Sequence, residues 1–111
     1  MSFEFGDVLV VEFPFTDGSN RKRRPAVVIS GAAYNATRAD FVMLAITSQL
    51  KGSEDGFDVL IDEWQAAGLK KASALKPVLF TLEAPYVRQR LGSLGANDVR
   101  ALRSLLSRII G

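Results

Sequence analysis

The chain has 111 residues, which is enough for one domain with a single modest core and too few for two domains. Hydrophobic residues make up 48% of the sequence, which excludes a disordered chain and predicts that residues 1–111 fold as one globular domain. The net charge of +2 excludes a generally polybasic nucleic-acid binder, although the charges are unevenly distributed along the chain.

Cysteine and histidine are both absent from the sequence. The first absence excludes disulfides and thiolate chemistry, and the second removes the commonest general base and the imidazole metal ligands. The carboxylates do not have the spacing of a calcium loop or of a magnesium or zinc site. We therefore expect no metal and no other cofactor, and any catalysis must use arginine, lysine, carboxylate, hydroxyl or backbone groups.

The apolar stretches are short, and the longest are residues 8–15 and 41–46. Neither is long enough to cross a bilayer, and the polar start of the chain lacks the pattern of a signal segment. We expect a cytoplasmic protein with no membrane association.

The first half of the chain predicts three strands and a loop. Residues 6–13 are rich in valine and predict a strand, and the polar residues 16–24 predict a loop with turn-forming pairs. A second strand is expected at 25–30, and a third, apolar on both faces and therefore expected to be central, at 40–46. A weak alternation predicts a fourth at 57–61.

The second half predicts a mixture of elements that ends in a helix. Residues 62–66 suit a short helical turn that ends at Gly68, and 78–82 suit a fifth strand. The pattern at 86–91 is ambiguous, whereas apolar residues recur at helical spacing through 99–110. Several short strands and one terminal helix predict a mainly β fold, an antiparallel barrel or curled sheet with the helix packed over one opening.

A block of four cationic residues, 21–24, stands directly before Pro25. Arg24 enters the predicted strand beside this proline, and its planar guanidinium matches two phosphate oxygens at once. We interpret Arg21 and Lys22 as solvated turn residues. For Arg24, phosphate binding and a plain basic turn are equally supported by these residues.

Two hydroxyls and an amide follow the most apolar strand, in Thr47, Ser48 and Gln49. A strand end can present such donors rigidly to an oxyanion. The alternative is a strand end whose hydroxyls bind their own backbone. Beside the basic loop, Phe13 and Phe15 could stack nucleobases, although core packing of Phe13 and loop anchoring of Phe15 are the simpler interpretations.

The order of these segments resembles the MazF/PemK family of toxins from type II toxin–antitoxin modules. The matching segments are GDVLVVEFPFTDGSNRKRRPAVVIS, DFVMLAITSQ, DEWQAAGLKKAS and LFTLE, so the similarity extends from Gly6 to the final helix. The resemblance implies an SH3-like antiparallel barrel of the CcdB/MazF type with a C-terminal helix, usually as a homodimer.

The resemblance also implies a function. It implies a metal-independent endoribonuclease toxin that cleaves single-stranded RNA, often mRNA, by attack of the substrate's own 2′-hydroxyl. The products would carry a 2′,3′-cyclic phosphate and a 5′-hydroxyl, and a cognate antitoxin protein would neutralise the growth inhibition. The catalytic positions of the family correspond to Arg24 and Thr47. The RNA-binding residues that we infer around them are Phe15, Thr16, Arg23, Ser48, Gln49 and Lys76.

The sequence departs from the family pattern before the LFTLE strand. One branch has a basic residue and an acid there, whereas this chain has Lys76 and no matching acid, which leaves the general base unassigned. The alternative function is a non-catalytic binding module on the same barrel. It would be a CcdB-like gyrase binder, which the Ile109-Ile110-Gly111 ending disfavours, or a degenerate binder of RNA or antitoxin.

Overall fold

The computed structural model describes residues 2–13, 22–51 and 55–111. Its strands are β1 (Asp7–Glu12), β2 (Arg23–Val28), β3 (Asp40–Thr47), β4 (Val59–Leu60), β5 (Ala74–Glu83) and β6 (Val87–Ser93). Its helices are α1 (Ala32–Thr37), the short 3-10 helix η1 (Ala84–Tyr86) and α2 (Ala96–Ile109). No helix in the described part of the chain is both long and apolar enough to pass through a bilayer.

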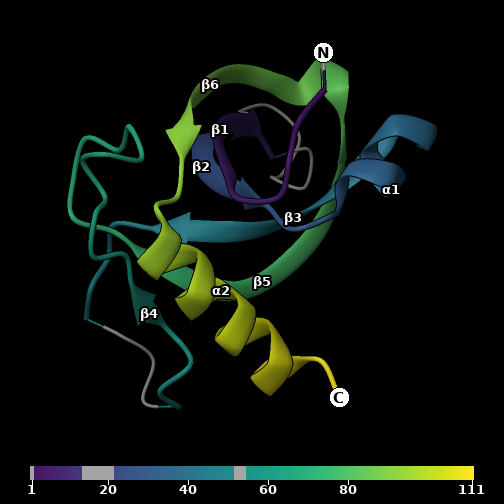
Figure 1. Cartoon of the computed structure of the whole chain (residues 1–111). Helices are drawn as coiled ribbons and strands as arrows, with labels where there is room; N and C mark the ends of the chain where they lie inside the picture. The colour runs from purple at the N-terminus through teal and green to yellow at the C-terminus, as the bar shows by residue number, and fades with distance from the viewer. Residues whose placement is uncertain (1, 14–21, 52–54) are drawn as a thin grey trace.

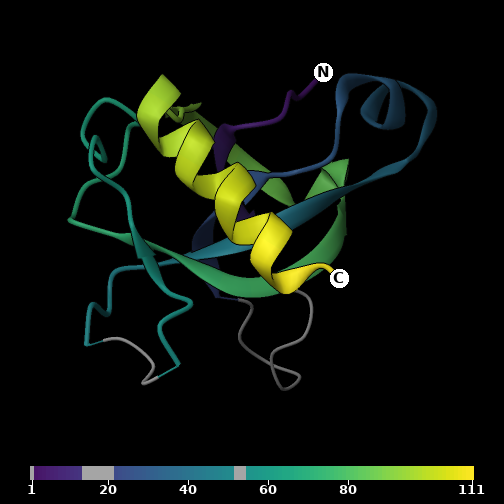
Figure 2. The same cartoon turned by 60° about the horizontal axis from the view of Figure 1, so that its bottom comes forward.

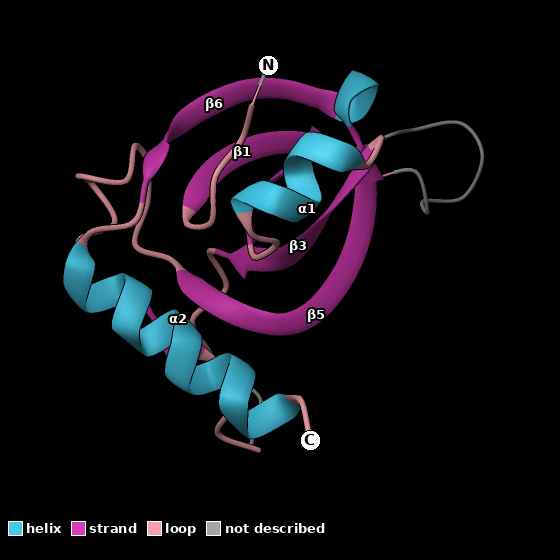
Figure 3. Ribbon diagram, turned by 45° about the vertical axis from the view of Figure 1, so that its right-hand side comes forward, coloured by secondary structure: helices cyan, strands magenta, loops and turns pink. Residues whose placement is uncertain are grey.

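The six strands form one antiparallel sheet in the order β4-β5-β3-β2-β1-β6. The three residues of η1 join β5 to β6, although these strands stand four places apart in that order. The sheet must therefore curl until the two strands approach each other, and Figures 1 and 3 show it bent into a ring. This arrangement confirms the predicted mainly β fold with a C-terminal helix.

The apolar residues of the strands pack on both sides of the curled sheet. Along β1, Val8 belongs to one core cluster while Leu9 and Val11 belong to the other, as the alternation of side chains along a strand requires. Helix α2 covers the first cluster, with Leu102 and Leu105 fully buried. Figure 2 shows this helix lying across the sheet, which confirms the amphipathic pattern predicted at 99–110.

Two of the predicted boundaries are wrong. The loop expected at 16–24 ends earlier, because β2 begins at Arg23, which pairs with Glu12 of β1. The strand expected at 78–82 is the end of a longer β5, whose pairing with β3 is irregular opposite residues 75–79. That irregular stretch accommodates Pro77, which lacks a backbone N–H for the ladder.

Other predictions failed where local signals were weak. Helix α1 was not predicted, since its six residues show no apolar face and no side-chain cap. The strand expected at 57–61 pairs with β5 through Val59 and Leu60. By contrast, the helical turn expected at 62–66 is present as hydrogen-bonded turns over residues 62–68 that end at Gly68. The ambiguous segment 86–91 lies mostly in β6, which β1 holds by its hydrogen bonds.

Candidate active site

The two predicted catalytic residues come from neighbouring strands. Strand β2 pairs with β3 so that Ala26 stands opposite Ala45. If this antiparallel register is continued by two residues toward the start of β2, Arg24 stands opposite Thr47. The pairing of β2 and β3 therefore places Arg24, near the start of β2, beside Thr47, at the end of β3.

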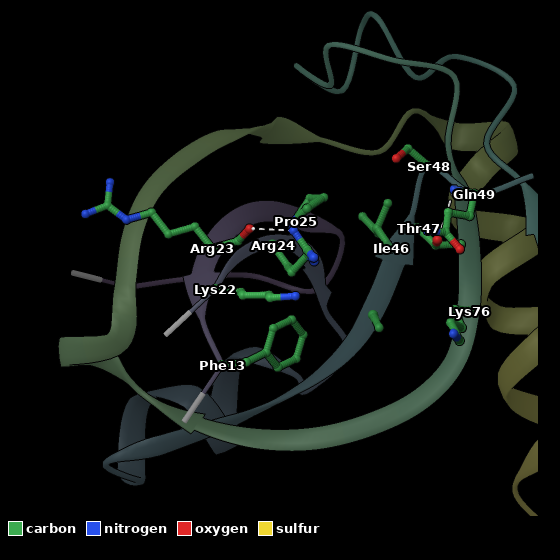
Figure 4. Close-up of a pocket in the computed structure, with 11 residues that line it drawn as sticks. Phe13, Lys22, Arg23, Arg24, Pro25, Ile46, Thr47, Ser48, Gln49 and Lys76 are labelled. Atoms are coloured by element: carbon green, nitrogen blue, oxygen red, sulfur yellow. Dashed lines mark hydrogen bonds between the residues drawn. The ribbon is translucent and has the colours of Figure 1, made fainter. Parts of the chain in front are cut away.

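A cleft of about 500 Å³ opens at this place. Its walls are Phe13, Lys22, Arg23, Arg24, Pro25, Ala45, Ile46, Thr47, Ser48, Gln49 and Lys76. All six described residues that the sequence predicted for the site therefore line one cleft (Figure 4). Phe15 and Thr16, predicted to bind RNA, lie outside the described residues.

Arg24 is exposed at the edge of this cleft. Within the described residues it forms no ion pair, and its guanidinium makes only a long hydrogen bond of 3.5 Å to the carbonyl oxygen of Arg23. A guanidinium without a carboxylate partner keeps its donors available for an anion. Arg24 thus has the exposure and freedom that phosphate binding requires.

Thr47 is half-buried at the end of β3, and its hydroxyl oxygen accepts a hydrogen bond of 3.1 Å from the backbone N–H of Gln49. The interpretation in which this hydroxyl caps its own backbone is therefore confirmed. The bond uses the oxygen as an acceptor, which leaves the hydroxyl proton available for donation into the cleft. Capping and substrate binding are compatible for this residue.

The surrounding side chains differ in how they face the cleft. Figure 4 shows Lys22 reaching toward its centre, whereas the side chain of Arg23 extends away from Thr47. Arg23 lies 3.9 Å from the Glu12 carboxylate. Lys22 was expected to be a solvated turn residue; it is exposed, and it also lines the cleft, which only the approach of β2 to β3 reveals.

Among the described residues, the walls of the cleft carry four cations and no carboxylate. Phe13 forms an apolar side of it and packs on Phe80 with ring centroids 4.9 Å apart. Among the residues with a described position, no group of three or more acidic side chains could hold a metal ion. This arrangement can bind an anion next to an apolar wall, and it can stabilise negative charge that develops on that anion.

A small curled β-sheet with a cation-lined cleft at its strand ends places the protein in the class of small barrel-like β proteins. Within this class, the chain belongs to the family described as PemK-like, MazF-like toxin of type II toxin–antitoxin system, whose model matches residues 4–110. The family resemblance found in the sequence is thereby confirmed. A comparison with curated protein sequences gave no match.

Several solved structures are similar to the chain. MazF from Deinococcus radiodurans (Form-I) gives a TM-score of 0.78 at 25% identity, over 100% of this chain and 98% of that one. The MazE–MazF structure (Form-II) from the same organism gives 0.75 at 26% identity, over 100% and 97%. An endoribonuclease from Mycobacterial species gives 0.76 at 16% identity, over 97% and 90%, and at this identity the likeness concerns the fold alone.

Proposed function

We propose that this protein is an endoribonuclease toxin that cleaves single-stranded RNA, with mRNA as its target, in the cleft between Arg24 and Thr47. The observation that carries the proposal is the meeting of these two side chains in a cleft whose described walls hold four cations and no carboxylate. Similar chains of known structure support this proposal, since one of them is an endoribonuclease in complex with its cognate antitoxin.

The reaction that fits the cleft uses the ribose as the nucleophile. The 2′-oxygen attacks the adjacent phosphorus and loses its proton, the bond from phosphorus to O5′ breaks, and O5′ takes up a proton. The products are a 2′,3′-cyclic phosphate and a 5′-hydroxyl. DNA lacks the attacking hydroxyl, so it is not a substrate.

The side chains of the cleft have distinct roles in this reaction. The Arg24 guanidinium binds the non-bridging oxygens and stabilises the charge that accumulates on the pentacoordinate phosphorus. The Thr47 hydroxyl donates to one of these oxygens. Lys22 and Lys76 bind neighbouring phosphates, and Phe13 provides an apolar surface for a base.

The proposal is tested with a labelled single-stranded RNA and a matched RNA that carries a 2′-deoxy nucleotide at the cut site. We expect cleavage of the first in the presence of EDTA, 5′-hydroxyl ends, and no cleavage of the second. Binding without scission would instead support the non-catalytic module. Inhibition of gyrase without any RNA cleavage would support the CcdB-like alternative.

We also propose that the cleft is the target of a cognate antitoxin. A cation-lined cleft with an apolar wall suits a peptide segment that combines acidic and apolar residues. The MazE–MazF structure of Deinococcus radiodurans provides a related case of such a partnership. An acidic antitoxin segment should therefore compete with RNA, and simultaneous binding of both would contradict this assignment.

A homodimer is the third part of the proposal. On the side of the sheet next to α1 and the end of α2, an apolar groove of about 350 Å³ lies between Ile29, Tyr34, Val42, Leu79, Leu106 and Ile110. Leu79 and Ile110 are 37% and 54% exposed, and burial of such side chains by a second copy would be favourable. Leu79→Asp should shift the protein to the monomer in light scattering coupled to gel filtration, and an unchanged dimer would contradict this interface.

A further inference from the structure

A second cleft, of about 340 Å³, adjoins the first. The two clefts share the Arg23-Arg24-Pro25 segment and Ser48, so Arg24 borders both. The new walls combine an apolar side, made of Val10, Leu69 and Leu91, with the amide of Gln89 and the ammonium groups of Lys70 and Lys71. None of these six residues was predicted to belong to the site.

The segment that carries the two lysines is held firmly against β6. Gly68 has a φ of +87°, and a Cβ at this position would lie 2.3 Å from the carbonyl oxygen of Leu91. Gly92 approaches from the other side, where a Cβ would lie 2.7 Å from the carbonyl oxygen of Ala67. Only glycines permit two backbones to come this close, so the turn before Lys70 has one position relative to the strand.

Two side chains fix the ends of the same segment. The buried carboxylate of Asp98 accepts hydrogen bonds from the backbone N–H groups of Asp62 at 2.8 Å and Glu63 at 3.0 Å. The buried hydroxyl of Ser73 donates to the carbonyl oxygen of Lys71 at 2.8 Å. The lysine pair is therefore mounted on a rigid turn rather than on a loosely held loop.

The distribution of partners separates the lysines from the arginines. Each of the five lysines of the chain lines the second cleft, the first cleft, or a third cleft next to Lys76. None of these lysines forms an ion pair with a described residue. Of the arginines that the structure describes, the six that line none of these clefts all have partners. These are Asp40 for Arg38, Glu12 for Arg88, Asp7 for Arg90, Asn97 for Arg100, Phe5 for Arg103 and Phe57 for Arg108.

We propose that the second cleft is a nucleotide subsite that binds the residue of the RNA next to the scissile phosphate and selects its base. This inference rests on the proposed function and adds a specificity site to it. Lys70 and Lys71 bind the phosphate of that nucleotide, and the base enters against Leu69 and Leu91. The Gln89 amide, which has both a donor and an acceptor group, reads the edge of the base.

Two exposed sets of residues provide the test. The double variant Lys70→Ala/Lys71→Ala removes two positive charges from the cleft, and Arg38→Ala/Arg100→Ala removes two from surfaces outside the clefts described here. Binding is measured across a salt series with a 2′-deoxy-substituted RNA that cannot be cut. Single strands lose about 0.7 in the slope of log K against log salt for each phosphate contact. Because the two lysines share one phosphate, the lysine variant should lower the slope by about 0.7 and the control should not.

Gln89→Leu keeps the size of the side chain but removes the hydrogen-bonding groups. Sequencing of the 5′-hydroxyl ends should show that the parent prefers one base at a single position beside the cut. In the variant, the ratio of cutting at the preferred base to cutting at the other bases should fall about tenfold at that position and at no other. Gln65→Leu, at an exposed glutamine outside the described clefts, is the matched control and should leave the pattern of cut sites unchanged.

The possible failures can be told apart. If the parent protein cuts RNA but the lysine variant keeps its salt slope and Gln89→Leu keeps its base preference, the subsite is wrong and the proposed function stands. If the lysine variant loses affinity for an antitoxin segment but not for RNA, the second cleft is a protein-binding site. If the parent binds RNA without cutting it, the proposed function fails while the salt series still decides the subsite. If the parent neither binds nor cuts RNA, both proposals fail.

Discussion

The cleft side of the barrel and its outer surface use cationic residues in opposite ways. On the outer surface Arg90 lies 3.2 Å from the buried Asp7, and Arg88 forms a hydrogen-bonded ion pair with Glu12. The bond to Glu12 raises the pKa of the Arg88 guanidinium above its ordinary value. In the two clefts that share Arg24, none of the wall residues that the structure describes is a carboxylate.

This difference indicates that the positions of the acidic residues determine which face of the protein is available to bind an anion. Cations occur on many parts of the surface, but most of those outside the clefts have a carboxylate, amide or aromatic partner nearby. The third cleft, next to Lys76, marks the limit of the cationic region, since Asp55 and Asp58 line it together with Lys51. An RNA strand is therefore expected to follow the two clefts that share Arg24, where the described wall residues present no like charge to its phosphates.

The largest effect is expected when the Arg24 cation is removed from the cleft. Arg24→Ala should lower the RNA cleavage rate by about 1000-fold, because the transition state loses a charged donor that no neighbour replaces. Circular dichroism and thermal unfolding should match those of the parent protein, since Arg24 is exposed. A rate close to that of the parent would show that Arg24 takes no part in the reaction. The difference between the clefts and the outer surface would then have no functional meaning.

A neutral donor in the cleft should have a smaller effect than the guanidinium. Thr47→Val removes the hydroxyl at nearly constant volume and should reduce kcat by about 100-fold, the usual effect of losing one oxyanion donor. Thr47→Ser keeps the donor and should retain most of the activity. Equal activities of the valine and serine variants would show that Thr47 only caps the end of β3.

The clamp that holds the lysine turn is tested through stability. Asp98→Ala leaves two part-buried backbone N–H groups without their charged acceptor, and the free energy of unfolding should fall by about 2 kcal/mol. Urea denaturation measures this loss. The folded fraction should also bind RNA more weakly, because the turn that carries Lys70 and Lys71 is no longer fixed. Full RNA affinity in this variant would show that the turn needs no clamp.

The smallest effect is expected for a paired cation outside the clefts. Arg88→Ala removes the same side chain as the first substitution, but its charge is already balanced by Glu12. RNA cleavage measured side by side with Arg24→Ala should stay within about twofold of the parent, as exposed ion pairs contribute little. A large loss of cleavage would mean that RNA contacts the outer face of β6. It would also mean that ion pairing of the cations does not distinguish the outer surface from the clefts.

Much of the fold followed from local patterns. A valine-rich run predicted β1, a run that is apolar on both faces predicted β3, and the helical spacing predicted α2, because each of these segments buries one face or both against a core. The family motifs then placed Arg24, Thr47 and Lys76 in one site, and the described structure brings them into one cleft. Boundaries such as the start of β2 at Arg23 depended on pairing with β1, which a local pattern does not contain.

The residues of the chain were sufficient to state which chemistry is available: arginine, lysine and hydroxyl groups, with no imidazole and no thiol. They did not reveal that Lys70 and Lys71 belong beside Arg24, nearly fifty positions earlier in the chain. That neighbourhood arises from the approach of the turn at Gly68 to β6 and from the hold of Asp98 on its start. Such contacts join distant segments, and their geometry depends on the curl of the whole sheet rather than on the order of residues in any one segment.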